Sequence, residues 1–491
     1  MSPYWIVFAI LLPIVGGVFT PILPFRKRAH MLLYLECLTI ATSVIVLSLL
    51  AHGTTETFHV IRFVNNLSIS FKIDGMTMIF GGLVSILWPC AMLYSFEYME
   101  HEKHETVFFA FYLMTFGVTL GIAFASDMLS MYFFYELLTL VTVPLIMHSL
   151  TREAIHAVRQ YIYMSLGGAA FALIGLVYLI VYGNTVEFTL GGVLSPARVA
   201  GDTNTLLLIY LLAFFGFGVK AAIFPLCSWL PKAGVAPTPV TALLHAVAVV
   251  KAGVFALIRL TYYSFGADFV RGTWVQGVTM AFAMFTIVYG CSRAVKETHI
   301  KRRLAYSTVS NLSYIVFGVT IMTPAGMVGA LAHMICHAFM KIGSFLCAGA
   351  IMHQTGKTYV YELDGLGRKM PVVFTCFTVS ALGLMGVPGL AGFISKWNLV
   401  EAAVSSNQVQ AYFGIGCLLL SALLTAIYMM SIVIRAFFPS KAFDEQVIQD
   451  VHDPNWKMCV PLVFFAVVVV LLGMCSGPLL SFLRAVAAGV Y

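Results

Sequence analysis

Long apolar runs, separated by short polar connections, are the feature that most limits what this chain can fold into. A run of about 18 apolar residues or more is long enough to cross a bilayer as a helix, and the sequence holds about fourteen such runs. Only 10% of its residues are charged, whereas a soluble domain carries roughly 25%. The sequence therefore predicts an all-α polytopic membrane protein. The expected spans are 4–23, 31–52, 75–95, 107–125, 128–149, 160–182, 206–226, 237–262, 273–292, 304–322, 325–353, 371–397, 411–437 and 459–485.

The positions of the basic residues predict the orientation. Eighteen of the 28 Lys and Arg residues lie in the odd-numbered connections, among them Lys301 and Lys441. Six lie in the even connections or near the C-terminus, namely Arg62, Lys72, Arg198, Arg259, Arg271 and Arg484. Because cytoplasmic connections are enriched in Lys and Arg, the odd connections are expected inside and both termini outside. The first run has no basic segment before it, so we interpret it as a membrane helix, not a removed signal.

Cysteine spacing gives no sign of a bound cofactor. The ten cysteines form no C-x-x-C pair, and nearly all lie in apolar runs, where cysteine usually acts as a small hydrophobic residue. We therefore expect no iron–sulfur cluster, haem or structural zinc, and no cofactor of any kind in this chain.

Two predicted helices carry residues that break helices. Pro237 and Pro239 open one in "APTPVTALLHAV", and "LMGVPGLAGFISKW" interrupts another with Pro388 and three glycines. Such breaks free backbone groups that lipid cannot satisfy, so they persist where they line a buried or hydrated cavity. Their placement, late in each half of the chain, favours two repeats of inverted topology.

Ionisable residues inside membrane spans are costly, and they are therefore candidates for function. Lys220 is expected in the middle of a helix, and Glu136, the only acid of its span, is its natural counter-ion. Asp127, at the start of that span, is expected to cap the helix. The alternatives are that Lys220 packs against carbonyl groups and that Glu136 is structural.

His245 and Lys251 share the helix that opens at Pro237. Six residues of separation place them roughly 120° apart on a regular helix, so they share one pathway only if the helix is irregular or if they act in succession. For His245 alone, simple packing is nearly as good an interpretation.

The pattern "HMICHAFMKIG" places His333, His337 and Lys341 at i, i+4 and i+8, on one face of a helix. Zinc would need a third ligand and usually a carboxylate beside it, and this span has no acid. Proton relay through ordered water fits this stripe better than a metal site or structural packing. Lys396 follows the glycine–proline break and either faces a cavity or extends to the outer surface. A chain of several such groups suits a proton, because about 30 Å of hydrocarbon is too thick for one transfer.

These residues resemble those of a known family. The stretches "MYFFYELLTL", "GVKAAIFPLCSWLPKAGVAPTPVTALLHAVAVVKAGVFALIR", "IKRRLAYSTVSNLSY", "HMICHAFMKIGSFLCAGAI", "GVPGLAGFISKW" and "FKIDGMTMIF" are similar to the antiporter-like membrane subunits of respiratory complex I, Mrp-type Na+/H+ antiporters and membrane-bound hydrogenases. The resemblance covers roughly residues 70 to 435. In length the chain is most similar to the shorter, D-type Mrp subunit or its counterparts in hydrogenase-like complexes.

The resemblance implies fourteen helices: helices 1–3 in residues 1–100, a first repeat of helices 4–8 in 101–262, a second of helices 9–13 in 263–437, and helix 14 in 438–491. Helices 7, 8 and 12 would be broken. It also implies that Glu136 and Lys220 are the family's glutamate–lysine pair, with His245, Lys251, His333, His337, Lys341 and Lys396 continuing the proton path. A prokaryotic-type inner membrane is the expected location.

Three positions depart from the family pattern. Cys227 stands where histidine is frequent, Lys232 where aspartate is frequent, and Gln160 where lysine is common. Two of them, Cys227 and Lys232, lie at the expected cytoplasmic end of the seventh helix, so they bear on how protons reach Lys220.

The preferred function is a proton-translocating subunit, with Na+/H+ antiport as a variant, within a multi-subunit complex. Its partners would be homologous and small membrane subunits, with iron–sulfur, flavin or hydrogenase-like subunits in a redox version; whether the chain belongs to an enzyme stays open, since no redox chemistry is expected in it. The alternatives are a self-sufficient carrier of a small solute, whose charges would cluster at one site, and a quinone-binding redox subunit.

Overall fold

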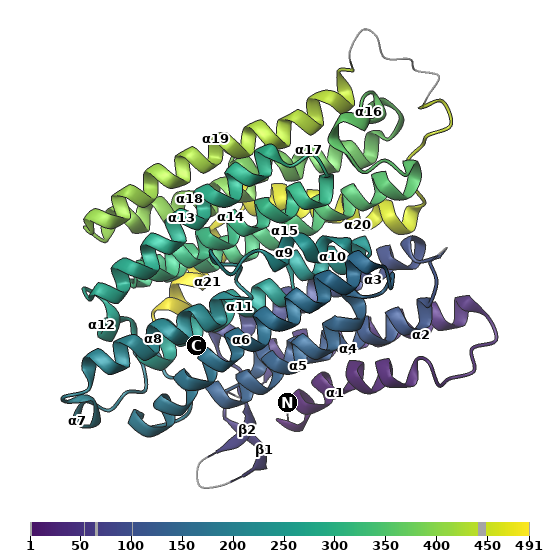
Figure 1. Cartoon of the computed structure of the whole chain (residues 1–491). Coiled ribbons are helices and arrows are strands. Elements are labelled where there is room, and N and C mark those ends of the chain that lie inside the picture. Colours follow the sequence, from purple (N-terminus) through teal and green to yellow (C-terminus); the bar gives the residue numbers. More distant parts are fainter. Residues whose placement is uncertain (1, 54, 64–66, 101, 440–447, 491) are drawn as a thin grey trace.

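The computed structural model describes residues 2–53, 55–63, 67–100, 102–439 and 448–490. Its long helices run side by side in one bundle, with a small hairpin of two strands at one end (Figure 1). The unbroken long helices are α1 (Tyr4–Phe19), α2 (Arg28–His52), α3 (Gly75–Tyr98), α4 (Glu105–Phe124), α5 (Met128–Ile146), α6 (Arg152–Tyr182), α8 (Thr203–Gly218), α13 (Trp274–Lys296), α14 (Ile300–Thr320), α15 (Pro324–Thr355), α19 (Val409–Phe437) and α20 (Trp456–Met474).

Interrupted and short helices complete the bundle. The interrupted ones are α10 (Thr238–Ala246), α11 (Val249–Ile258) and the π-helix η2 (Arg259–Phe265), then α17 (Pro371–Met385) with α18 (Ala391–Ser405). A further helix, α21 (Gly477–Ala487), follows α20. The short ones are α7 (Pro196–Val199), α9 (Trp229–Lys232), α12 (Ala267–Val270), α16 (Leu366–Lys369) and the 3-10 turns η1 (Ala233–Val235) and η3 (Val360–Glu362).

The predicted membrane fold is confirmed in its class. Among the described residues, ten helical segments are long and apolar enough to cross a membrane, and four shorter apolar helices accompany them. Each of the fourteen predicted runs contains helix, but the number of crossings stays a prediction, as do the repeats and the four-part division of the chain. Besides the two runs with predicted breaks, two more are not one continuous helix: in 459–485 the chain turns at Cys475 and Ser476 between α20 and α21, and in 206–226 α8 ends at Gly218.

Burial separates an outer shell from an inner core. α2 and α19 turn apolar side chains outward, for example Leu33 and Leu419, as helices in contact with lipid do. By contrast, the segments Thr238–Phe265 and Pro324–Thr355 are almost completely enclosed by other helices. The segments that carry His245, Lys251 and the "HMICHAFMKIG" stripe therefore form the centre of the bundle.

Side-chain caps define several helix starts. The predicted cap Asp127 accepts a hydrogen bond from the backbone N–H of Ser130 at 2.7 Å, and Asp74 accepts one from Thr77 at 2.9 Å. Such caps satisfy backbone donors that have no partner inside the helix. The hairpin beside these starts, β1 (Phe58–Arg62) and β2 (Ser68–Phe71), is antiparallel and was not predicted.

Lys220 is not in the middle of a helix, contrary to the prediction from the apolar run, whereas the broken seventh helix that the resemblance implies is present. α8 ends at Gly218, and residues 219–228 form an irregular segment of turns before α9. The helix of His245 and Lys251 is also irregular, because α10 ends before Val247 and α11 begins after Ala248. The third break lies between α17 and α18, where Gly386 and Gly389 have φ of 91° and 87°, values that favour glycine.

The α17–α18 break is packed so closely that it yields a testable prediction. A Cβ atom added at Gly392 would lie 1.8 Å from the carbonyl oxygen of Gly383, so Gly392→Ala must push α18 away from α17. We expect a loss of at least about 1–3 kcal/mol of stability, the usual cost of overpacking. Thermal unfolding of the detergent-purified protein measures it. The control is Gly416→Ala on α19, where a Cβ meets nothing within 4 Å; equal melting of the two variants would contradict the packing.

Candidate functional site: a buried polar axis

Six of the eight candidate residues are completely enclosed in the bundle. Lys220, His245, Lys251, His333, His337 and Lys341 each have 0% exposure. Glu136 and Lys396 are partly buried. They come from five helices, α5, α10, α11, α15 and α18, and from the irregular segment after α8.

Lys220 is held against α5. Its ammonium donates a hydrogen bond to the backbone carbonyl of Tyr135 and lies 3.5 Å from the centre of the Tyr135 ring. Glu136, the next residue, is near enough for its charge to act on Lys220. The Lys220 ammonium binds the Tyr135 carbonyl and not the Glu136 carboxylate, and Glu136 Oε1 is buried without a hydrogen-bond partner among the described residues. The expected pair is therefore a neighbouring acid and base without direct contact.

Lys251 connects two core helices. Its Nζ lies 2.9 Å from Nδ1 of His337, which joins α11 to α15. Near by, Gly253 leaves no space between α11 and the backbone of Lys220: an added Cβ would lie 2.6 Å from the Lys220 carbonyl carbon. Because the helix is interrupted between α10 and α11, His245 and Lys251 both face α15: Lys251 contacts His337, and His245 contacts Phe345. On a regular helix the two side chains would point about 120° apart.

The side chain of His245 packs against the core but makes no hydrogen bond within the described residues. Its ring stacks on Phe345 with 4.7 Å between centroids, and neither ring nitrogen has a hydrogen-bond partner in the described part of the chain. A histidine that only packs usually satisfies one nitrogen, since a buried polar atom without a partner is costly. Ordered water at this position would satisfy both nitrogens.

The three stripe residues of α15 reach three different partners. His333 Nδ1 lies 2.9 Å from Ser395 Oγ on α18, and His337 binds Lys251 on α11. Lys341 donates to Ser307 Oγ on α14 at 2.7 Å. The two histidine rings are 5.8 Å apart, and Nε2 of each lacks a partner among the described residues. The predicted stripe is thus a hub that faces α11, α14 and α18.

Lys341 leads into a network of hydroxyl groups that was not predicted. Ser307 Oγ lies 2.6 Å from the hydroxyl of Tyr428, which in turn donates to Thr425 at 3.2 Å. Serine and threonine are frequent in membrane helices, so the sequence does not single out Ser307 or Thr425. Only their position beside Lys341 and Tyr428 in the fold shows that they form a network.

Lys396 binds the carbonyl groups that the helix break leaves free. Its Nζ donates to Leu384 O at 2.6 Å and Met385 O at 3.1 Å, at the C-terminal end of α17, and lies 5.3 Å from the Tyr314 ring. The negative end of the α17 dipole favours a cation there. The alternative of an ammonium that extends to the outer surface does not match these contacts.

A buried ion pair outside the axis was also missed. Arg259 was counted with the even connections, but its side chain is 1% exposed and binds Asp74 through two hydrogen bonds of 2.6 and 2.8 Å. The rings of Phe188, Phe255 and Tyr263 surround its guanidinium. The partners are far apart in sequence, so no local pattern indicates the pair.

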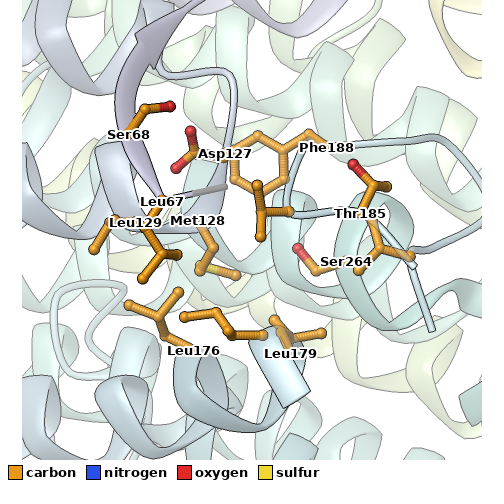
Figure 2. Close-up of a pocket in the computed structure, with 13 residues that line it drawn as sticks. Leu67, Ser68, Asp127, Met128, Leu129, Leu176, Leu179, Thr185, Phe188 and Ser264 are labelled. Atoms are coloured by element: carbon orange, nitrogen blue, oxygen red, sulfur yellow. The ribbon is translucent and has the colours of Figure 1, made fainter. Parts of the chain in front are cut away.

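Two of the cavities in the described part of the chain bear on the site, although no axis residue lines them. The first, enclosed between α5, α6 and the end of η2, is lined mainly by apolar side chains with Asp127 and Ser264 at its edge (Figure 2). Its volume of about 20 Å³ has room for about one water molecule. The second measures about 770 Å³, and its lining includes Gln160, Lys232 and Arg302. Among the described residues, no three His, Cys, Asp or Glu side chains come close enough to hold a metal ion.

The fold and the axis define a class: a polytopic helical membrane protein with a buried line of lysine and histidine. Residues 125–430 match the family described as "NADH:quinone oxidoreductase/Mrp antiporter, TM", and residues 63–109 match "NADH-Ubiquinone oxidoreductase (complex I), chain 5 N-terminus". The chain belongs to this family of antiporter-like membrane subunits, as the sequence resemblance indicated.

Individual relatives agree with this assignment. NADH-quinone oxidoreductase subunit N of Desulforudis audaxviator is 31% identical over 358 residues, which cover 72% of this chain and 70% of the relative. Na+/H+ antiporter subunit A1 of Staphylococcus aureus is 28% identical over 96% of this chain, which spans only 61% of that longer relative. A chain in the structure of the Mrp complex from Dietzia has the same fold, with a TM-score of 0.84 and 22% identity over 100% of this chain and 98% of that chain.

Proposed function

We propose that the chain moves protons across the membrane as one subunit of a multi-subunit ion-translocating complex. The observation that carries the proposal is the 2.9 Å contact between Lys251 and His337. It joins two titratable side chains, both fully buried, from two different core helices. Structural packing rarely places two potential cations against each other, because each disfavours the charge of the other.

Protons would reach Lys220 from the 770 Å³ cavity. Gln160, on its wall, donates to Ser228 at 2.7 Å, and the neighbouring Trp229 donates to the carbonyl of Val219 at 2.8 Å. Gln160 and Lys232 thus take the place of the lysine and aspartate common in the family. The remaining distance to Lys220 would be crossed by water, which bridges polar groups at little cost.

From Lys220 the proton would continue along the axis in steps. A proton that arrives at Lys251 weakens proton binding at His337, because two charges in contact repel each other in a medium of low dielectric constant. His333 and Lys396 follow through Ser395 and α18, and Lys341 branches to Ser307. Lysine and histidine suit this task, since a neighbouring charge can switch either between charged and neutral forms.

The partners and the location are proposed from the relatives, which are named as subunits of an NADH-quinone oxidoreductase and of a Na+/H+ antiporter. We propose homologous and small membrane subunits as partners, a prokaryotic-type inner membrane as the location, and both termini outside. Iron–sulfur or flavin subunits would be present only in a redox version of the complex. Na+/H+ antiport stays a variant of this proposal: sodium would need oxygen ligands, and beside the axis these are the Glu136 carboxylate and the hydroxyls of Ser307 and Ser395.

Purification of a tagged chain in mild detergent, followed by mass spectrometry and proton uptake in vesicles, tests this function. The proposal expects homologous membrane subunits in the preparation and acidification or alkalinisation of the vesicle lumen under an imposed ion gradient. A monomer that transports a small solute without moving protons would contradict it and support the carrier alternative.

The hydroxyl bridge between Lys341 and Tyr428 gives a specific prediction. Ser307→Ala removes the oxygen that binds both, and a lost hydrogen bond to a charged group is worth about 1.5–3 kcal/mol, or roughly a ten- to hundredfold slower transfer. Proton uptake by vesicles measures the change. Ser344→Ala is the matched control, because Ser344 is equally buried on α15 and bonds only its own helix at Met340. Similar rates for the two variants would exclude Ser307 from the path.

A further inference from the structure

Glu36 is a membrane carboxylate that the axis does not use. It lies in the third turn of α2, inside a span that contains no other acid. Its Oε2 atom is buried and has no hydrogen-bond partner in the described part of the chain. α2 packs on α1 and α3 and touches α4, none of which carries an axis residue, whereas the axis residues lie on α5, α10, α11, α15 and α18 and after α8. Glu36 therefore belongs to a different part of the bundle.

Helices α2 and α3 carry further buried polar atoms without a hydrogen-bond partner among the described residues. Trp88 Nε1 and the hydroxyls of Ser43 and Ser85 have no hydrogen-bond partner among the described residues, although these side chains are 0%, 5% and 1% exposed. All lie on α2 and α3, which pack together. Buried acceptors, donors and hydroxyls without a protein partner are the groups that ordered water satisfies, because water both donates and accepts.

Among the described residues, the helices around Glu36 supply no free lysine or arginine to balance its charge. The described residues of α1, α3, α4 and α5 include no lysine or arginine, and Arg28 at the start of α2 is bound to Glu105 at 2.6 Å. The titratable groups near Glu36 are Cys90 on α3 and Tyr112 on α4, on which its charge acts, and on α2 itself Cys37, one position along, and Tyr34, whose hydroxyl donates to Gly16 O. These are neutral acids and supply no positive charge.

An isolated carboxylate without a counter-charge is far more costly in an apolar medium than the neutral acid. We propose that Glu36 binds and releases a proton in a hydrated site between α2, α3 and α4, separate from the polar axis. The site opens toward the membrane, because Cys37 beside it is exposed and Leu33, one turn away, is 64% exposed.

A lipid-soluble carbodiimide tests this proposal in the intact complex. The reagent adds the O–H of a protonated carboxylic acid across its C=N bond, so it marks carboxyl groups that are neutral inside a membrane. Peptide mass spectrometry of treated membranes should find at least about tenfold more adduct on Glu36 than on Glu105, whose carboxylate is bound by Arg28 at 2.6 Å. Adduct formation should fall as pH rises and be equal in sodium and choline buffers.

Three results would overturn the proposal: no adduct on Glu36, an adduct that does not depend on pH, or protection by sodium but not by choline. The last would mean that Glu36 binds a metal cation. Glu36→Gln should remove the adduct from this peptide, and the wild-type experiment stands even if that variant does not assemble. The labelling needs no transport, so Lys220→Ala complex should label at Glu36 like wild type even if the proposed function is wrong.

Discussion

Replacement of Lys220 by alanine is expected to slow proton uptake by at least about a hundredfold, the usual effect of removing a group that transfers a proton. Lys220 is the titratable group that connects the α5 side of the bundle to α11: its ammonium binds the Tyr135 carbonyl, and its backbone touches Gly253. Without it, no side chain of the axis lies between Glu136 and Lys251. Proton uptake by vesicles that contain the purified complex measures the rate.

Two controls make this result specific. Lys220→Arg keeps the positive charge, but arginine cannot give up its proton, so proton uptake should also be lost in this variant. If Lys220 had only a structural role as a cation, arginine would restore proton uptake. Lys296→Ala, at the end of α13, removes a lysine outside the axis and should leave uptake unchanged. Assembled Lys220→Ala complex that moves protons at the wild-type rate would show that this lysine is not in the path.

Removal of Arg259 is expected to destabilise the protein more than any other single substitution considered. Arg259→Met leaves Asp74 charged, 13% exposed and without its partner, and loss of one member of a buried ion pair costs about 3–5 kcal/mol. The substitution also removes the contacts of the Arg259 guanidinium with three aromatic rings. A large fall in the melting temperature of the purified protein, or failure to assemble, is the expected result.

A double variant separates the ion pair from simple packing. Arg259→Met combined with Asp74→Asn removes both charges, and asparagine can still cap α3, so much of the stability should return. Asp268→Asn is the control, because it breaks the exposed pair with Arg271 and should change stability by about 0–1 kcal/mol. If the double variant melts no higher than Arg259→Met alone, the unpaired carboxylate is not the cause.

The sequence predicted the membrane class and the core segments because apolar length and rare buried charges are local properties. The position of Lys220 within its helix was wrong, because the run from Leu206 to Leu226 is apolar apart from Lys220 and shows no local end at Gly218. The contacts of Lys220 with Tyr135 and Gly253 are tertiary and leave no local signal. The same limit applies to Ser307 and Ser395, whose importance comes only from the lysine and histidine that they face.

Arg259 and Glu36 show two further reasons for failure. Arg259 was counted with a connection because it stands near the end of the predicted span 237–262, and its partner Asp74, 185 positions away, gave no local sign of a buried pair. Glu36, by contrast, lies well inside the predicted span 31–52 and could have been identified by the rule that flagged Glu136, since both are acids within apolar runs. Lys441, counted with the odd connections, lies outside the described residues.

The central claim is that protons pass from Lys251 to His337. Its most direct test is proton uptake by vesicles that contain the assembled complex with Lys251→Met, driven by an imposed membrane potential so that no electron donor need be known. Methionine keeps most of the side-chain volume and removes the Nζ that lies 2.9 Å from His337. The account predicts that uptake is lost while assembly is kept. Uptake at the wild-type rate in the assembled variant would contradict it.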